Sequence, residues 1–197
     1  MSPFTPFWSI AERLARFSKE EKERIENGLI YKEIPAKFRL VDFDETAHQA
    51  YFILEGFSRF YFINDRLDEI TGFIFSPGQF FTSLESFLSR SSSNQAVESI
   101  TPMKLLAINR DDLEVWMDEI PGIERMIRMV LQERMIYAQS VVASLIALKP
   151  EERYQNMLET RPDLVQHIPQ HILSSYMGIT PVSLSRIRSR IKEKPQE

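Results

Sequence analysis

The chain has 197 residues, a formal net charge of −4 at pH 7 and no cysteine. This length can bury one good core and a smaller second unit. The absence of cysteine excludes disulfides, thiolate metal sites and cysteine nucleophiles. The sequence has no run of about 18 apolar residues and no signal-peptide pattern at its start. We therefore expect a cytoplasmic protein that does not contact a membrane.

The first half of the chain predicts helices followed by strands. Residues 7–27 are predicted to be helical, with Ser18 as the N-cap of a second, Lys- and Glu-rich piece that ends at Gly28. Short apolar or alternating runs then follow, broken by turn residues, which is typical of an all-β barrel, roll or sandwich. The predicted strands cover residues 29–34, 38–43, 51–54, 57–63, 70–75, 96–101 and 103–108.

A long helix is predicted after the strands. Pro121-Gly122 interrupts the helical segment that begins at 109–112, and residues 123–148 contain neither proline nor glycine. Apolar residues recur there about every 3.5 positions, as in paired helices. The stripe contains Ile123, Ile127, Val130, Tyr137, Val141 and Leu145, with Arg134 as its polar interruption. We expect this helix to form a homodimer contact; the alternative is a core helix of a single chain.

The end of the chain predicts two short helices joined by a turn at Gly178. Pro169 opens the first helix, while Thr180 and Pro181 suit the N-cap and first residue of the second. Apolar residues of the second helix recur at helical spacing and form one buried face. These are Leu184, Ile187 and Ile191. The pattern is typical of a helix-turn-helix, whose second helix lies in the DNA major groove.

Small and basic side chains occupy the rest of the second helix. Small residues permit close approach to a groove, and arginines suit phosphates and guanine edges. The candidate DNA-binding residues are Thr180, Val182, Ser183, Ser185, Arg186, Arg188 and Arg190. The alternative is an ordinary amphipathic hairpin with a solvated basic face. The five basic side chains and single acid at 181–194 disfavour it.

Segment 175–188, Ser-Tyr-Met-Gly-Ile-Thr-Pro-Val-Ser-Leu-Ser-Arg-Ile-Arg, resembles the recognition segment of the CRP/FNR family of bacterial transcription regulators. The strand–Gly56–strand segment and the Pro77-Gly78 turn resemble parts of the family's cyclic-nucleotide-binding roll. The resemblance covers nearly the whole chain. It implies an α+β fold in three parts: a cyclic-nucleotide-binding-like β-roll with N-terminal helices at 1–120, a dimerisation helix at 121–148, and a helix-turn-helix domain at 149–197.

The same resemblance assigns roles and shows departures near the DNA. Arg186 matches the family's base-reading arginine, and Val182 stands where many members carry a glutamate, so it could pack on a thymine methyl. Many members also have β-hairpin wings around the helix-turn-helix. Segment 160–169 is short and interrupted by proline, and only six residues follow Ile191. We therefore expect a reduced or absent wing.

The ligand pocket departs further from the family pattern. Nucleotide-binding members place a glutamate on the ribose and an arginine on the cyclic phosphate, a strong charge-assisted contact. Here both positions are uncharged, and Arg90 is the nearest substitute. The degenerate pocket is expected to contain Gly78, Phe81, Thr82, Ser83, Leu84, Asn94 and Gln95. A response to cyclic AMP is therefore not expected.

These features predict a dimeric DNA-binding transcription regulator that is not an enzyme and uses no cofactor. The implied partners are near-palindromic double-stranded DNA and a second copy of the chain, with RNA polymerase as a further candidate and any effector unknown. The alternative is a CRP-like interaction protein with vestigial DNA contact that acts on a protein partner. His167 and His171 lie four residues apart, but no carboxylate joins them at helical spacing, so no metal site is expected.

Overall fold

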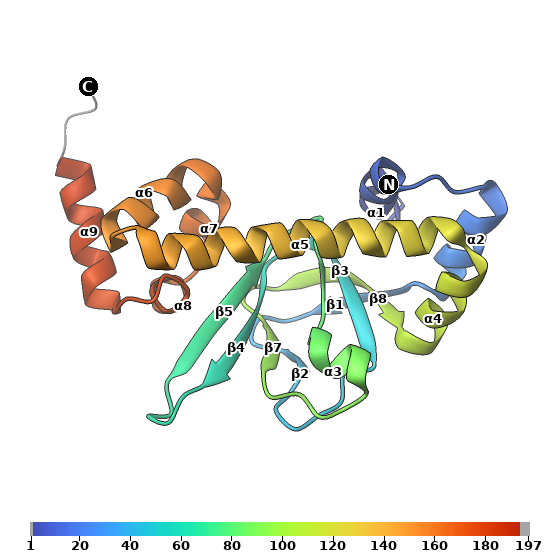
Figure 1. Ribbon diagram of the computed structural model, residues 1–197, viewed down its shortest axis with the longest axis horizontal. Coiled ribbons are helices and arrows are strands. Elements are labelled where there is room, and N and C mark those ends of the chain that lie inside the picture. The colour runs from blue at the N-terminus through green and yellow to red at the C-terminus, as the bar shows by residue number, and fades with distance from the viewer. Residues whose placement is uncertain (1, 194–197) are drawn as a thin grey trace.

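The structure is a computed structural model that describes the backbone of residues 2–193 and the side chains of residues 2–191. The last residues of the predicted helix-turn-helix domain, 194–197, lie outside the described part. The chain forms an antiparallel β-roll with helices at its N-terminal side, one long helix, and a small helical unit at the far end (Figure 1). The predicted α+β fold is confirmed.

Two helices begin the chain and cover one sheet of the roll. They are α1 (Thr5–Leu14) and α2 (Lys19–Gly28). Ser18 caps α2 through a capping box with Glu21: the Glu21 N–H donates to Ser18 Oγ at 3.2 Å, and the Ser18 N–H donates to the Glu21 carboxylate at 2.6 Å. From α1, Phe7 and Ala11 pack into an apolar cluster around Phe52. This packing fixes α1 against the roll.

Two four-stranded antiparallel sheets form the roll, in the orders β1-β8-β3-β6 and β2-β7-β4-β5. The strands are β1 (Ile30–Ile34), β2 (Arg39–Val41), β3 (Gln49–Glu55), β4 (Ser58–Ile63), β5 (Glu69–Phe75), β6 (Phe80–Phe81), β7 (Ala96–Ser99) and β8 (Met103–Asn109). All seven predicted strands are present, although several are shorter than expected. The additional strand, β6, has two residues and was not predicted. Apolar side chains such as Tyr51, Phe75 and Leu105 form the core of the roll.

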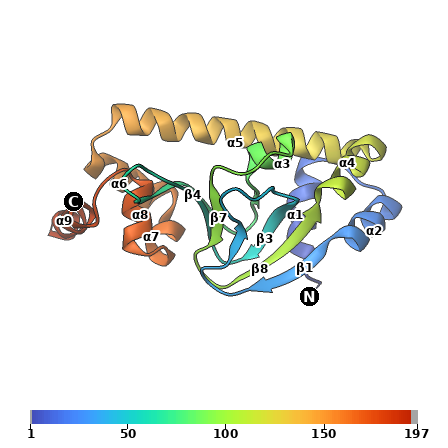
Figure 2. The ribbon, with the colours of Figure 1, turned by 90° about the horizontal axis from the view of Figure 1, so that it is seen from below.

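Seven further helices follow or interrupt the strands. They are α3 (Leu84–Ser89), α4 (Arg110–Glu119), α5 (Pro121–Ala147), α6 (Pro150–Thr160), α7 (Pro162–His167), α8 (Gln170–Tyr176) and α9 (Pro181–Glu193). Helix α5 runs along the roll and links the N-terminal helices to α6–α9 at the other end, as the view from below also shows (Figure 2). It begins at Pro121 rather than after Gly122, because proline is well tolerated in the first turn of a helix. None of the described helices is long and apolar enough to span a membrane.

Most of the apolar stripe predicted for dimerisation faces the chain's own roll or its C-terminal helices, which corrects the assignment of those residues. Ile123 is 1% exposed and belongs to the chain's own core. Further along, the ring of Tyr137 packs edge-on against Phe73, with centroids 5.1 Å apart. The other inward-facing members of the stripe are Ile127, Val130, Arg134 and Val141. Of the predicted contact residues, Leu145 is the one whose side chain is largely exposed, at 45%.

A second apolar band of α5 is exposed beside that stripe. Its members recur every three or four residues, so they share one side of the helix. We call this band the α5 seam; it consists of Leu131, Met135, Ala138, Val142, Leu145 and Ile146. The sequence contains both stripes, and the structure shows which one the roll covers.

The C-terminal helices share an apolar cluster with the roll. Leu164, Leu173 and Leu184 are fully buried in this cluster, together with Ile74 of β5. Helix α8 also packs along β5. The helical unit is therefore docked on the roll rather than attached only through α5.

Candidate DNA-binding surface

The turn between α8 and α9 has the geometry that the sequence predicts. Gly178 has a φ of +67°, in the left-handed region that glycine adopts most easily. Its N–H donates to the carbonyl of Ser175, and the Ile179 N–H donates to the carbonyl of Ser174, each at 3.0 Å. These bonds satisfy the last carbonyls of α8 in the manner of a Schellman motif. The chain can then reverse direction within three residues.

Helix α9 begins at a capped N-terminus. The Ser183 N–H donates to Thr180 Oγ1 at 3.1 Å, which confirms Thr180 as the N-cap, and Pro181 is the first helical residue. Leu184 and Ile187 are 0% and 3% exposed and lie in the cluster shared with α6–α8. The predicted buried face is therefore present, and it holds α9 in a fixed rotation.

One face of α9 is open to solvent. Val182, Ser185, Arg186 and Ser189 are all exposed, and their i, i+3, i+4, i+7 spacing places them on one side. We call these four residues the α9 face. Helix α9 lies at the end of the molecule, on the far side of the helical unit from the roll (Figure 1). Ser189 was not among the predicted site residues, although its spacing from Val182 could have indicated it.

Arg186 is the free cation of this face. Within residues 2–191 its guanidinium has no hydrogen-bond or ion-pair partner. The other predicted arginines are already engaged by α6. Arg188 is half-buried and donates to the Tyr154 hydroxyl at 3.2 Å, while Arg190 forms an ion pair with Glu151 at 3.3 Å. Ser183 is also half-buried, and its hydroxyl contacts that of Thr180 at 3.0 Å.

No β-hairpin precedes the helix-turn-helix in the described chain. Within segment 160–169, where a wing was considered, the chain forms α7, which begins at Pro162 and ends before Pro169. The ring of His167 at its end stacks on Phe57 of the roll, with centroids 5.2 Å apart. The expected absence of a wing before α8 is thus explained by a short helix. Within residues 2–191, no three His, Asp or Glu side chains are grouped as metal ligands.

Solved structures with this architecture include a transcriptional regulator assigned to the CRP/FNR family and other bacterial regulators. FixK2 from Bradyrhizobium japonicum superposes with a TM-score of 0.72 at 19% identity, over 83% of this chain and 84% of that one. A putative CRP/FNR regulator from Eubacterium rectale gives 0.72 at 13% identity, over 97% and 88%. The c-di-GMP-responsive regulator CLP from Xanthomonas campestris gives 0.70 at 16%, over 89% and 92%.

The chain has the CRP/FNR fold. No family model matches the sequence, and no curated protein sequence does either. The likeness is thus one of architecture.

Two of the residues expected in the degenerate ligand pocket, Ser83 and Gln95, belong to a closed network of neutral side chains. Ser83 and Ser93 are 1% and 3% exposed, and their hydroxyls lie 2.7 Å apart. The side-chain amide of Gln95 donates to Ser83 Oγ at 3.2 Å, and Ser93 Oγ donates to the main-chain carbonyl of Gln95 at 2.6 Å. These polar groups satisfy one another and present no charge to a phosphate. Ser93 was not predicted as part of this site.

The remaining predicted pocket residues do not gather around a ligand-sized space. Phe81 is buried between Tyr51 and Phe75, and Thr82 donates to the Gln49 carbonyl at 2.8 Å. Leu84 and Asn94 are exposed, and Gly78 faces Ile10 of α1.

Arg90 is not a substitute for the missing phosphate ligand. Its guanidinium points to α4, where it pairs with Glu114 at 2.6 Å and with Asp111 at 3.5 Å. The residues of this region therefore do not fit a cyclic nucleotide.

Proposed function

We propose that this chain is a dimeric, sequence-specific DNA-binding transcription regulator that does not respond to cyclic AMP. The observation that carries the proposal is the α9 face. A helix with a capped start, a buried side fixed by Leu184 and Ile187, and an unpaired exposed Arg186 has the features of a recognition helix. Its charge and shape suit the major groove, where arginine binds guanine edges.

The four residues of the α9 face would make different kinds of contact with DNA. Arg186 would donate to the O6 and N7 atoms of a guanine, and Val182, which is 60% exposed, would pack on a thymine methyl. Ser185 and Ser189 would allow close approach. Thr180, Ser183, Arg188 and Arg190 are proposed to contact phosphates, with Arg188 and Arg190 first giving up part of their contact with α6.

Dimerisation is proposed to use the α5 seam. Val142 and Ile146 are 55% and 82% exposed, and an exposed apolar stripe on a 27-residue helix is best covered by a parallel copy of the same helix. Two copies would present two α9 helices to a near-palindromic site, with half-sites about 34 Å apart. Contact with RNA polymerase belongs to the same proposal.

The absence of a cyclic-nucleotide response is supported by the uncharged Ser83–Ser93–Gln95 network. Cyclic AMP or cyclic GMP at millimolar concentration should leave the melting temperature of the protein unchanged. A ligand that binds only the folded state raises it. A clear increase with either nucleotide would overturn this part of the proposal.

DNA recognition is tested by selecting bound sequences from a random pool and then measuring affinity at one fixed salt concentration. For the selected site, Arg186→Ala should weaken binding about tenfold or more and relax the preference at one base pair in each half-site. Arg16→Ala is the matched control, since Arg16 is an exposed arginine next to α1 at the opposite end of the molecule.

Equal binding by Arg186→Ala and wild type would overturn the recognition-helix assignment. If, in addition, no sequence were enriched from the pool, the alternative of an interaction protein with vestigial DNA contact would take its place. An equal loss in Arg16→Ala would show that overall charge, rather than the α9 face, determines binding.

A further inference from the structure

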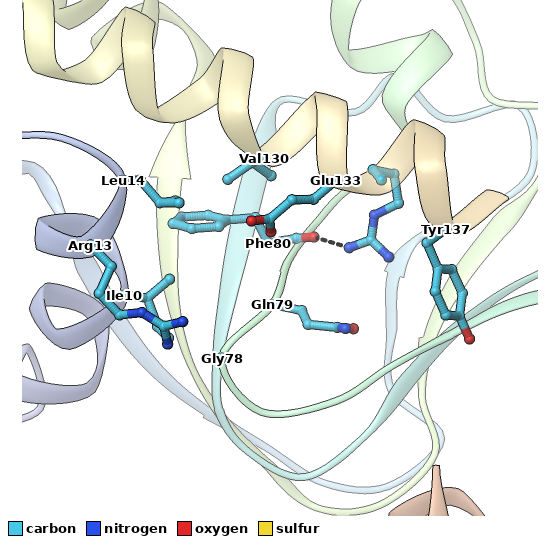
Figure 3. A pocket seen from close by; sticks show the side chains of 10 residues that line it. Ile10, Arg13, Leu14, Gly78, Gln79, Phe80, Val130, Glu133 and Tyr137 are labelled. Carbon is cyan, nitrogen blue, oxygen red and sulfur yellow. Dashed lines mark hydrogen bonds between the residues drawn. The ribbon is translucent and has the colours of Figure 1, made fainter. Parts of the chain in front are cut away.

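A cavity of about 310 Å³ lies outside the roll, where α1, the turn between β5 and β6, and α5 meet (Figure 3). Apolar side chains form much of its wall, and they come from all three segments. These are Ile10, Leu14, Phe80 and Val130. The volume falls within the range of small-molecule sites. The cavity is distinct from the Ser83–Ser93–Gln95 network, since none of those residues lines it; of the residues predicted for the ligand pocket, Gly78 lies at this cavity.

Arg134 supplies an unpaired positive charge to this cavity. Its guanidinium donates to the Phe80 carbonyl at 3.0 Å, the bond drawn as a dashed line in Figure 3, and lies over the rings of Phe73 and Phe75. In the described part of the chain no carboxylate pairs with it. Burial lowers the pKa of Arg134, because the charged form loses water. Its N–H groups other than the one bonded to Phe80 are free to donate to a ligand in the cavity.

Gln79 adds a neutral donor to the same wall. Its side-chain oxygen accepts from the Ser76 N–H at 3.1 Å, so the oxygen is identified and the amide nitrogen faces elsewhere. That nitrogen has no acceptor among the described residues. In Figure 3 the Gln79 side chain lies between those of Arg13 and Tyr137. Two donors of different kinds therefore line one small space.

The charges around the cavity limit the ligand. Arg13 and Arg134 contribute two positive charges and Glu133 one negative charge, which leaves one net positive charge. A monoanion neutralises this sum, whereas a phosphate dianion would leave excess negative charge beside Glu133. A carboxylate also matches the planar fork of a guanidinium.

We propose that this cavity binds a small monocarboxylate with an apolar body. The carboxylate would accept from Arg134 and the Gln79 amide, with Arg13 closing over it, and the apolar body would pack on Ile10 and Val130. None of the residues of the α5 seam lines the cavity, so a dimer formed through the seam would leave the cavity open. The proposal goes beyond DNA binding and does not depend on it.

Calorimetry and thermal unfolding of the full-length protein test the site with octanoate as the probe. Octanol is the uncharged counterpart, acetate lacks the apolar body, and octyl phosphate carries a second charge. Octanoate should bind and raise the melting temperature. The other three compounds should bind at least about tenfold more weakly than octanoate.

Variants then locate the site. Arg134→Lys keeps the charge but loses the planar fork, and Arg13→Gln removes an exposed charge without disturbing the core; each should weaken octanoate binding several-fold. Arg16→Gln, an exposed arginine close to Arg13 that does not line this cavity, should leave it unchanged.

Four results would overturn the proposal. They are no octanoate binding at millimolar concentration, equal binding of octanol, tighter binding of octyl phosphate, or equal losses in Arg13→Gln and Arg16→Gln. If Arg134→Lys does not fold, Arg13→Gln and the ligand series still decide the matter. Because the readout is ligand binding alone, failure here leaves the DNA-binding proposal untouched.

Discussion

The hydroxyl of Ser175 makes the hydrogen bonds to the backbone at Thr71 and Glu69 that a neighbouring strand would otherwise make. The Thr71 N–H donates to Ser175 Oγ at 2.9 Å, and the same hydroxyl donates to the Glu69 carbonyl, also at 2.9 Å. Both backbone groups belong to β5, the end strand of its sheet, so one edge of β5 has no strand to pair with. Ser175 of α8 thus adds two hydrogen bonds to the apolar contact between the helix-turn-helix and the roll.

Replacing Ser175 should weaken this attachment. Ser175→Ala removes both hydrogen bonds and leaves the buried Thr71 N–H without a partner, so the free energy of unfolding should fall by about 1–3 kcal/mol. Urea unfolding measures the change. Ser140→Ala is the control, because that hydroxyl is exposed and donates only to the Tyr137 carbonyl of its own helix. Equal stabilities of the two variants would mean that the Ser175 contact contributes nothing.

Arg186 and Arg188 of α9 should separate stability from recognition. Arg188 lies over the ring of Tyr154, 5.7 Å from its centroid, and donates to its hydroxyl. Arg188→Ala should therefore lower the free energy of unfolding by about 1–2 kcal/mol. Arg186→Ala, which removes an exposed side chain, should stay within about 0.5 kcal/mol of wild type. Chemical unfolding in the absence of DNA measures both changes in unfolding free energy. A larger loss in Arg186→Ala than in Arg188→Ala would contradict the packing of α9.

Two adjacent residues of α5 test the position of the proposed dimer contact. Met135 and Ile136 are 62% and 67% exposed, but Met135 belongs to the α5 seam and Ile136 lies on another side of the helix. Met135→Glu should place a charge in the contact and convert the dimer to a monomer, whereas Ile136→Glu should remain dimeric. Light scattering after size-exclusion chromatography measures the mass. Loss of the dimer in both variants, or in neither, would rule out the seam as the contact.

Tyr51 should make the protein less stable at high pH. Burial raises the pKa of Tyr51 from 10.0 to about 12. The pKa of Tyr51 in the folded state lies above its value in the unfolded state. The contribution of the buried, neutral phenol to the stability of the fold is therefore fully present below pH 10 and is lost as the pH rises to about 12. The expected loss is about 1.4 kcal/mol per pH unit in this range.

Tyr51→Phe should flatten this part of the stability curve, measured as unfolding free energy between pH 9 and pH 12. Burial, with a contribution from Tyr137, also raises the pKa of Tyr176. That group is present in both proteins, so the difference between the two curves reports Tyr51. Identical slopes would show that the Tyr51 phenol ionises without cost to the fold.

Much of the fold could be predicted because the sequence carries strong local signals. Alternating apolar residues predicted the strands of the roll, and Ser18, Gly178 and Thr180 predicted caps and turns that the structure contains. Helix α3 and strand β6 were missed because each is too short to show a period. Helix α7 was also missed, although Pro162 is a usable helix-start signal.

The orientation of side chains could not be predicted in the same way. Helix α5 carries two apolar stripes, and a sequence does not show which of them the roll covers. Arg188 borders the buried face of α9, where a long side chain can lie along an aromatic ring as easily as extend into solvent. Arg90 pairs with Glu114, a contact between residues 24 apart that no local pattern encodes.

Helix α5 also makes the cavity and the seam mechanically dependent on each other. Val130, Glu133 and Arg134 line the cavity, while Leu131 and Met135 belong to the seam, so both sets project from the same turns of one continuous helix. An α-helix resists twisting because every turn is tied to the next by hydrogen bonds. Any adjustment of the cavity wall that turns α5 about its axis must therefore change the angle at which the seam meets a second helix. In the proposed dimer, a rotation of α5 near residue 134 would therefore change the spacing between the two sets of C-terminal helices.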